Sequence, residues 1–261
     1  MGQPVAGNGA NRRIASWTVV IMTYDRPAQL EKLLADIERE RAGLSVSVHV
    51  YDDCSSEDYG QVVDWLEGHD DCYVRAEENH GLMGHWRWFS RALQDLRETR
   101  SEYYLFLQDD MRLCSDFFQR ILTRWKSVDD TRKIALNPLV DEGRKDKPCW
   151  TGVLPERHGH VDLTGWVDAA FLCERRLLEE LEFRIDPIPS SRWERNPKLS
   201  SGVGWNISTR LHTRRLNIYR TLESLVAHVP VKTRMHLGLS APVRAVNFID
   251  GEEAHQRLCR E

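Results

Sequence analysis

Three short apolar runs in the first half of the chain each end in a polar cluster, and this pattern restricts the fold more than any other feature. The runs Thr18–Thr23, Val46–Tyr51 and Tyr103–Leu107 have the length and the β-branched and aromatic content of buried strands. Segments with helical periodicity lie between them, such as Pro27–Glu40, in which apolar residues recur at positions 30, 33, 34 and 37. Strands that alternate with helices in this way predict an α/β fold with a mainly parallel central sheet flanked by helices.

The alternation continues to residue 136 and then becomes less regular. In the second half, Arg175–Leu181 has a helical pattern, but Lys145–Gly165 is loop-like and Asp186–Ser201 is rich in Pro, Ser and Arg. We expect one domain over residues 16–250, with a disordered tail at 1–15 and a C-terminal tail at 251–261. The other predicted elements of the first half are helices at Tyr59–Leu66, His85–Leu96 and Phe117–Trp125 and strands at Cys72–Glu77 and Ile134–Leu136.

Length and composition exclude several classes of protein. The chain has 261 residues, enough for one large α/β domain, and no apolar run approaches the ~18 residues of a membrane helix. The first residues lack the apolar core of a secretory signal, so we expect a cytoplasmic protein without a membrane span. The six cysteines are scattered without a CxxC pair, which predicts reduced thiols rather than a zinc site or a disulfide framework.

Acidic side chains collect where three of the predicted strands end, at the edge of an open parallel sheet where ligands bind. Neighbouring carboxylates repel, so paired acids here suit Mg²⁺ or Mn²⁺ bound to a diphosphate. The alternative is that each pair caps the helix that follows it. Neither G-x-G-x-x-G nor G-x-x-x-x-G-K-[ST] occurs, which counts against a Rossmann dehydrogenase and a P-loop NTPase. The clusters are Thr23–Arg26, Asp52–Ser56 and Asp109–Asp110.

Four motifs follow one another in the first 140 residues. Thr18–Asp25 reads TVVIMTYD, Val50–Asp58 reads VYDDCSSED, Asn79–Leu82 reads NHGL before a helix, and Leu105–Met111 reads LFLQDDM. This ordered set resembles the nucleotide-sugar-dependent glycosyltransferases of the GT-A fold, especially the family 2-like set. The resemblance implies a nucleotide-sugar-binding half at 16–140, an acceptor half at 141–250, and a sugar donor in which UDP is the favoured nucleotide.

The resemblance also implies roles for individual residues. Asp110 would coordinate a divalent ion, Mn²⁺ or Mg²⁺, that bridges the diphosphate, and His228 in Ser224–His228 would complete its ligands. A packed or surface histidine is the alternative for His228. The sequence departs from the family at Gln108, which stands at the first acidic position of the D-x-D motif and brings no charge. The residues expected to bind the nucleotide sugar are Thr23, Tyr24, Asp25, Arg26, Asp52, Asp53, Asn79, Gly81 and Asp109.

The resemblance leaves the catalytic base open. Many inverting members carry an acidic pair before a helix, but the corresponding stretch here, Ser200–Asn206, contains no acid. Asp168 and Glu194 are the nearest carboxylates and are the candidates for the base that takes the acceptor proton. An ordinary loop carboxylate is the alternative for Asp168, and inverting and retaining chemistry both stay open. Candidates for stacking on a sugar or base, each with core packing as the alternative, are Trp86, Trp88, Trp166, Trp193 and Trp205.

The acceptor is the least determined part of the prediction. Between positions 190 and 244, ten Lys and Arg face two Glu, a balance of +8 that leaves −12 for the rest of a chain with a net charge of −4. A glycan or a small molecule requires no special signature. The basic segment 190–244 would suit DNA, and some phage-type transferases of this fold modify hydroxymethylated pyrimidines in DNA. A solvated basic face is the alternative explanation of the charge.

The sequence therefore predicts a metal-dependent, hexosyltransferase-like enzyme that transfers sugar from a nucleoside diphosphate to a hydroxyl. Two other hypotheses stay open: a protein that binds a nucleotide sugar or nucleic acid without catalysis, and a degenerate transferase without turnover. Gln108 and the missing acidic pair are the features that keep the degenerate transferase open. A nucleotidyltransferase shares the architecture, but it usually has a glycine-rich basic loop after the first strand, where this chain reads TYDRPAQL.

Overall fold

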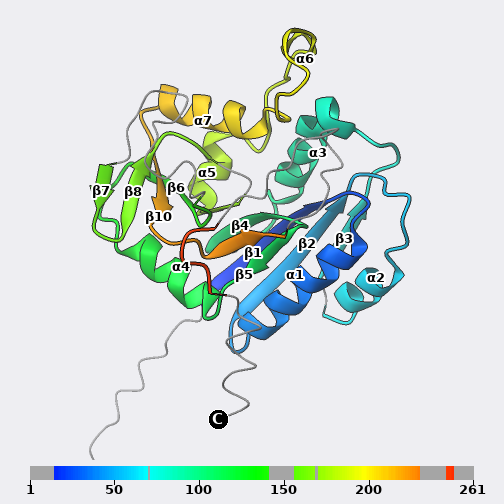
Figure 1. Cartoon of the computed structure of the whole chain (residues 1–261), viewed down its shortest axis with the longest axis horizontal. Coiled ribbons are helices and arrows are strands. Elements are labelled where there is room, and N and C mark those ends of the chain that lie inside the picture. Colours follow the sequence, from blue (N-terminus) through cyan, green and yellow to red (C-terminus); the bar gives the residue numbers. More distant parts are fainter. Residues whose placement is uncertain (1–14, 70, 141–155, 168–169, 230–244, 250–261) are drawn as a thin grey trace, which may run out of the picture.

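The computed structural model describes residues 15–69, 71–140, 156–167, 170–229 and 245–249 as an α/β fold built on one large sheet (Figure 1). In this part of the chain, nine strands follow the order β3-β2-β1-β4-β9-β6-β10-β8-β7, and β11 pairs with β5 in a second sheet. The strands are β1 (Ser16–Thr23), β2 (Ser45–Asp52), β3 (Cys72–Arg75), β4 (Tyr103–Gln108), β5 (Met111–Leu113), β6 (Lys133–Asn137), β7 (Glu156–His158), β8 (Val161–Thr164), β9 (Phe171–Cys173), β10 (Asn217–Thr221) and β11 (Val226–His228). The helices are α1 (Pro27–Glu40), α2 (Gly60–Glu67), α3 (Gly81–Asp95), α4 (Phe117–Lys126), α5 (Arg175–Glu180), α6 (Ser191–Arg195) and α7 (Val203–Thr213).

The predicted α/β class is confirmed, and the sheet is parallel in its N-terminal half. Strand β1 pairs in parallel with β2 and with β4, and β2 pairs in parallel with β3, as the βαβ pattern predicts. Beyond β4 the sheet is mixed, because β9 lies antiparallel between β4 and β6. Strands β8 and β7 then add an antiparallel edge beside β10.

The second half contains more regular structure than its sequence pattern indicates. Strands β7 and β8 fall within the stretch expected to be a loop, and α6 falls within the Pro- and Ser-rich stretch. Strands β7 and β8 have only three and four residues, too short for a local pattern, and β8 pairs with β7 on one side and with β10, far along the chain, on the other. Helix α3 also begins at Gly81 rather than at the predicted His85, which brings its first turn to the edge of the sheet.

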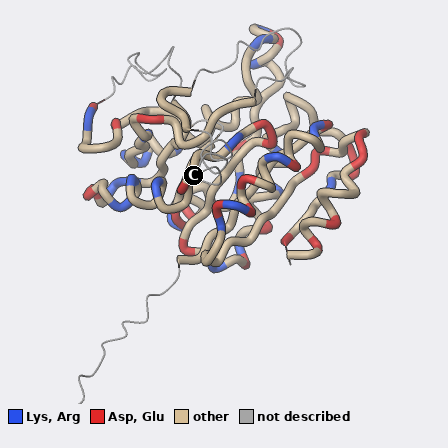
Figure 2. Tube along the Cα trace, turned by 60° about the horizontal axis from the view of Figure 1, so that its bottom comes forward, with Lys and Arg blue, Asp and Glu red and all other residues tan. Residues whose placement is uncertain are grey.

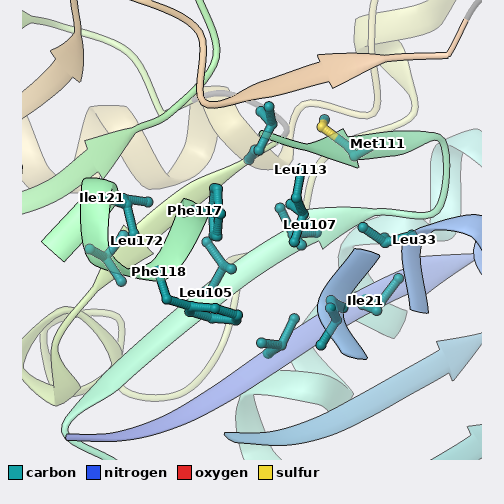
Figure 3. Close-up of a cluster of buried hydrophobic side chains, with 14 of the residues drawn as sticks. Ile21, Leu33, Leu105, Leu107, Met111, Leu113, Phe117, Phe118, Ile121 and Leu172 are labelled. Carbon is teal, nitrogen blue, oxygen red and sulfur yellow. The ribbon is translucent and has the colours of Figure 1, made fainter. Parts of the chain in front are cut away.

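Two hydrophobic clusters hold the helices against opposite faces of the sheet. Successive side chains of β1 point to opposite faces, so Val19 and Ile21 join one cluster and Val20 and Met22 join the other. The first cluster packs α1, α2 and α4 on one face, and Figure 3 shows the part of it between β4, β5 and α4. The second packs α3, α5 and α7 on the other face. Because both faces are covered, polar side chains gather at the ends of the strands.

The register of the parallel strands brings their carboxyl ends to one level. Thr23 at the end of β1 is paired with Asp52 of β2, and Met22 is paired with Gln108 of β4. The backbone N–H of Asp53 continues the ladder by donating to the carbonyl of Thr23 at 3.0 Å. The polar residues after each strand therefore emerge at one edge of the sheet, as predicted.

A buried ion pair fixes β5, the short strand that follows Asp110 directly. The Asp36 carboxylate on α1 is 1% exposed and accepts hydrogen bonds from Nε of Arg112 at 2.7 Å and from the backbone N of Leu113 at 3.0 Å. Strand β5 in turn pairs with β11, which ends at His228. Helix α1 therefore holds in place the two segments that bring Asp110 and His228 together.

Replacing Asp36 with alanine is expected to lower the free energy of unfolding by about 3–5 kcal/mol, because the Arg112 guanidinium then loses its buried carboxylate partner. Glu31→Ala on the exposed face of the same helix is the control, with an expected change below about 0.5 kcal/mol. Urea unfolding at neutral pH measures both values. Equal unfolding midpoints for the two variants would show that this ion pair does not hold α1 against β5.

Several predictions fall outside the described residues: residues 1–14 of the N-terminal tail, the C-terminal tail 251–261, and Asp168. In the described ranges, no helix combines the length and the apolar composition needed to cross a bilayer. The four described cysteines, Cys54, Cys72, Cys114 and Cys173, are free.

Candidate active site

A cleft of about 230 Å³ opens where β1, β2 and β4 end. Its walls come from the ends of β1 and β4, from the loop after β2 and from the first two turns of α3. The predicted edge of the sheet therefore carries a real concavity, of the kind in which α/β proteins bind ligands. The expected nucleotide-sugar ligands that lie in its wall are Thr23, Tyr24, Arg26, Asp53, Asn79, Gly81 and Asp109.

One guanidinium links the two acidic residues at the end of β4. Nη1 of Arg26 lies 3.1 Å from Oδ1 of Asp109 and 2.7 Å from Oδ2 of Asp110, and all three side chains are largely buried. Asp109 also accepts hydrogen bonds from Oγ1 of Thr23 at 2.8 Å and from the backbone N of Tyr24 at 3.3 Å. Two carboxylates this close together require a shared cation, and Arg26 supplies one.

The two carboxyl groups have pKa values that shift in opposite directions. Burial, together with the neighbouring Asp110 charge, raises the pKa of Asp109 to about 7, although Arg26 and Thr23 act against this shift. Burial also opposes the ionisation of Asp110, but the hydrogen bond and charge of His228 and the charge of Arg26 hold its pKa below the usual value. Asp110 is therefore the more anionic member of the pair and the better ligand for a cation.

His228 reaches Asp110 because β11 pairs with β5. Nδ1 of His228 lies 3.2 Å from Oδ1 of Asp110. A carboxylate oxygen beside an imidazole nitrogen is a donor pair that suits Mn²⁺. In the described part of the chain, no group of three or more His, Cys, Asp or Glu could hold a metal by itself. Asp110 and His228 therefore supply two donors that a metal ion could use, and the remaining ligands would have to come from a bound molecule.

Asp53 binds the beginning of α3. Its Oδ1 accepts a hydrogen bond from the backbone N of His80 at 2.9 Å, and its Oδ2 accepts one from the backbone N of Gly81 at 3.1 Å. Nδ2 of Asn79 donates to the backbone carbonyl of Asp53 at 2.8 Å. Gly81 has φ +56°, in the left-handed region that favours glycine, which explains the glycine of the NHGL motif. Asp53 therefore caps a helix. This helix is α3, whereas the alternative given for the acidic pairs predicted a cap on the helix that follows directly, which is α2.

Asp25 and Asp52 shape the loop after β2 and are not part of the cleft wall. Asp52 is fully buried and accepts hydrogen bonds from the Ser55 hydroxyl and from the Tyr73 hydroxyl, the latter at 2.6 Å. Oδ1 of Asp25 accepts a hydrogen bond from the backbone N of Ser56 at 2.6 Å. Both carboxylates are therefore engaged in bonds that stabilise the loop, at positions where the sequence predicts contacts to a nucleotide.

Two further cleft residues come from α3. His85 and Trp88 lie on the same helical face as Gly81, four and seven residues after it, and both line the cleft. The imidazole of His80 stacks on Trp88 with ring centres 5.4 Å apart. Sequence reasoning does not single out His85, because it places the start of the helix at this residue. The i, i+4, i+7 spacing from Gly81 is the signal that would have identified it.

A second pocket of about 150 Å³ adjoins the first and shares Met22, His85 and Gln108 with it. Its floor is apolar, and Ser200 and Ser201 lie at the other side, before α7. Neither candidate for the catalytic base is placed here. Glu194 is exposed on α6 and is not in the wall of either pocket, and Asp168 lies outside the described residues.

The chain has the GT-A fold, as its likeness to solved structures of that fold shows. It matches mannosyltransferase PcManGT from Pyrobaculum calidifontis, solved in complex with GDP-Man and Mn²⁺, with a TM-score of 0.56 and 17% identity over 86% of this chain. It matches S. aureus TarS 1–349 in complex with UDP-GlcNAc with a TM-score of 0.55 and 13% identity over 87% of this chain. The chain spans 60% and 62% of the lengths of these two structures. No model of a known protein family matches, and no curated protein sequence matches.

His85 gives a pH dependence of stability that can be measured. Burial lowers its pKa to about 4, whereas an unfolded histidine titrates near the ordinary 6.5. The unfolded chain therefore binds the extra proton first, so the stability contributed by neutral His85 is present above about pH 6.5 and is lost as the pH falls towards 4. His85→Gln is expected to reduce the loss of unfolding free energy between pH 7.5 and pH 5 by about 1–2 kcal/mol.

Urea unfolding at the two pH values measures this effect. His158→Gln in the exposed strand β7 is the control and should leave the pH dependence unchanged. An identical loss for the unsubstituted protein and for His85→Gln would contradict the lowered pKa.

Proposed function

We propose that this protein is a metal-dependent glycosyltransferase that moves a sugar from a nucleoside diphosphate to an acceptor hydroxyl. The observation that carries the proposal is the cleft at the carboxyl edge of the sheet. Arg26 and Asp109 lie in its wall, and Asp110, behind the wall, lies 2.7 Å from Arg26. A diphosphate requires cationic partners, and a metal held by Asp110 together with the Arg26 guanidinium would provide them. The structures that the chain resembles contain GDP-Man with Mn²⁺ and UDP-GlcNAc, which agrees with a nucleotide-sugar donor.

The donor nucleotide would lie between β1 and the start of α3. The wall there contains Tyr24, Asn79 and Trp88. Trp88 is 6% exposed, and its Nε1–H has no acceptor in the described part of the chain. UDP is the nucleotide we expect, on the resemblance of the sequence motifs.

A divalent ion would be held by Asp110 and His228, and when bound it would neutralise charge on the leaving diphosphate. During transfer, the bond between the anomeric carbon and the phosphate oxygen breaks and the acceptor oxygen bonds to that carbon. The acceptor proton passes to a carboxylate base, for which Asp168 is the first candidate and Glu194 the second. Arg26 would stabilise the developing negative charge from the β1 side of the cleft.

The second pocket is the place for the acceptor, because it meets the first at His85 and Gln108. The acceptor hydroxyl would belong to a glycan or a small molecule, of which a part would enter this pocket of about 150 Å³. Hydroxymethylated pyrimidine in DNA is the alternative acceptor, and a flipped base would enter the same pocket. A protein that binds the nucleotide sugar without turnover is the remaining alternative.

The test is release of nucleoside diphosphate from UDP-, GDP- and TDP-sugars with Mn²⁺, with EDTA, and with plain or hydroxymethylated duplex DNA. We expect metal-dependent release in the folded protein and a loss of about 100-fold in Asp110→Asn, because the metal-binding carboxylate is neutralised. Asp64→Asn, an exposed carboxylate on α2, is the matched control and should keep full activity. Titration calorimetry with UDP and Mn²⁺ measures donor binding in the same preparations.

Full release in EDTA, or full activity of Asp110→Asn, would rule out the metal role. Tight nucleotide binding without release from any donor or acceptor would favour the binding protein. Stimulation by hydroxymethylated DNA alone would identify the DNA acceptor. A folded protein that bound none of the three nucleotides would contradict the proposed function.

A further inference from the structure

The proposed reaction requires a proton acceptor beside the second pocket, because the acceptor hydroxyl loses its proton as it attacks the anomeric carbon. Acidic residues are frequent over the described part of the chain, as the red segments in Figure 2 show. None of the described residues that line the second pocket, however, carries a carboxylate. Glu194 is not in its wall, and Asp168 lies outside the described residues.

His85 is the one titratable side chain in the described wall of the second pocket. Met22, His85 and Gln108 line both pockets, so they lie where the donor and the acceptor would meet. The Met22 thioether and the Gln108 amide do not take up a proton at neutral pH, whereas a neutral imidazole does. Among the described residues of the two walls, His85 alone combines the position and the chemistry that this step requires.

The imidazole of His85 is not engaged elsewhere. It is partly exposed, and within the described ranges its ring nitrogens make no hydrogen bond and no ion pair. Its ring meets Phe89, one turn later on α3, edge-on with ring centres 6.2 Å apart. A polar side chain that lines a cleft without a partner is available to a bound molecule.

The two acids in the wall of the first pocket are engaged in bonds that hold the fold. Asp53 accepts hydrogen bonds from backbone N–H groups at the start of α3, and Asp109 is bound by Arg26 and Thr23. Neither carboxylate lines the second pocket. Both are therefore poorly placed to take a proton from a molecule bound there.

Packing of α3 fixes the position of His85. Phe89 stacks on Phe106 of β4 with ring centres 5.4 Å apart, and both rings line the second pocket. The Ser90 hydroxyl accepts a hydrogen bond from the backbone N of Ile185 at 2.9 Å. Helix α3 thus holds the imidazole at one place between the two pockets, as a group that acts in a transition state requires.

The basicity of this imidazole matches that of the carboxylates that commonly act as bases. Burial lowers the pKa of His85 to about 4, while the charge of Asp53 opposes this shift and that of His80 adds to it. Ordinary carboxyl groups titrate at ~3.9 in Asp and ~4.3 in Glu. The other charged groups in the described wall of the first pocket are Arg26 and Asp109. His85 is therefore unprotonated at neutral pH and accepts a proton about as readily as an aspartate does.

We propose that His85 takes the proton of the acceptor hydroxyl during sugar transfer. The inference rests on the proposed function and deepens it, and Asp168, the first carboxylate candidate, is the competing assignment. The acceptor oxygen bonds to the anomeric carbon, while the bond from that carbon to the phosphate oxygen breaks and its electron pair leaves with the nucleoside diphosphate. The hydroxyl proton moves to a ring nitrogen of His85, and the resulting imidazolium later releases it to water.

The test measures turnover with water as the acceptor probe, because water fits any acceptor pocket and loses a proton in the same step. The donor is the one of the UDP-, GDP- and TDP-sugars from which the full chain releases nucleoside diphosphate fastest with Mn²⁺. We expect His85→Gln to lower kcat about 100-fold, the size of a lost general base. The donor KM and the affinity for the matching nucleoside diphosphate should change less than threefold.

Two further variants on α3 separate proton transfer from packing. His85→Glu places a carboxylate where the imidazole was and should recover at least tenfold of the lost kcat. Met83→Gln changes an exposed residue of the same helix that lines neither pocket, and should keep kcat within twofold. Thermal unfolding shows that each variant is folded.

A second measurement does not depend on turnover. Diethyl pyrocarbonate modifies neutral imidazole, and peptide mass spectrometry gives its rate at His85. In the urea-unfolded chain, where a histidine titrates near 6.5, this rate should fall about 30-fold from pH 7.5 to pH 5. In the folded protein it should fall less than twofold, and UDP with Mn²⁺ should slow it at least fivefold by occupying the cleft.

Three results would overturn the proposal. Full kcat in His85→Gln is the first, and a loss in Asp168→Asn would then assign the proton to that carboxylate. The second is a loss that His85→Glu does not recover, which would leave His85 a role in holding the substrate, and the third is absence of labelling at His85 in the folded protein. The proposed function fails in a different way: the unsubstituted protein then releases no nucleoside diphosphate from any donor, and the role of His85 falls with it.

Discussion

The arrangement of the site depends on the need to balance the charge of two neighbouring buried carboxylates at the end of one strand. Asp109 and Asp110 follow β4 at a point where both faces of the sheet are covered, so water screens them poorly. Arg26 joins them through one nitrogen, Thr23 donates to Asp109, and His228 lies against Asp110. These charges and hydrogen bonds compensate one another only if β1, β4 and the pair β5–β11 keep their relative positions.

The fold meets this condition with contacts that lie away from the cleft. The register of β1 with β2 and β4 places the polar turns at one level. Asp36 on α1 holds β5, and β5 holds β11, so His228 reaches a carboxylate 118 positions earlier in the chain. Asp53 fixes the start of α3 and thereby places His85 and Trp88 in the cleft wall. The edge of the sheet that carries the candidate site therefore depends on residues whose own role is to hold strands and helices in place.

The charge of segment 190–244 counted along the sequence differs from the charge that its ion pairs leave in the folded structure. A count along residues 190–244 gives +8 and suggests a broad polyanion surface. In space, Arg210 faces Asp186, Arg214 faces Glu180 and Arg220 faces Asp162, acids that belong to other segments. Among the described basic residues of this segment, those without a recorded ion pair are Arg192, Arg195 and Lys198 on or beside α6 and Arg215 after α7.

The sequence by itself determined the α/β class, the parallel strands of the N-terminal half and the edge at which Thr23, Asp53 and Asp109 meet. These follow from short-range patterns: apolar runs of strand length, helical periodicity, and polar residues directly after each strand. The tertiary structure alone decided that Asp52 is buried under the loop, that His85 and Trp88 face the cleft, and that β8 pairs with β10. The physical reason is that burial, ion pairing and strand pairing depend on partners far apart in the chain, which local propensity does not encode.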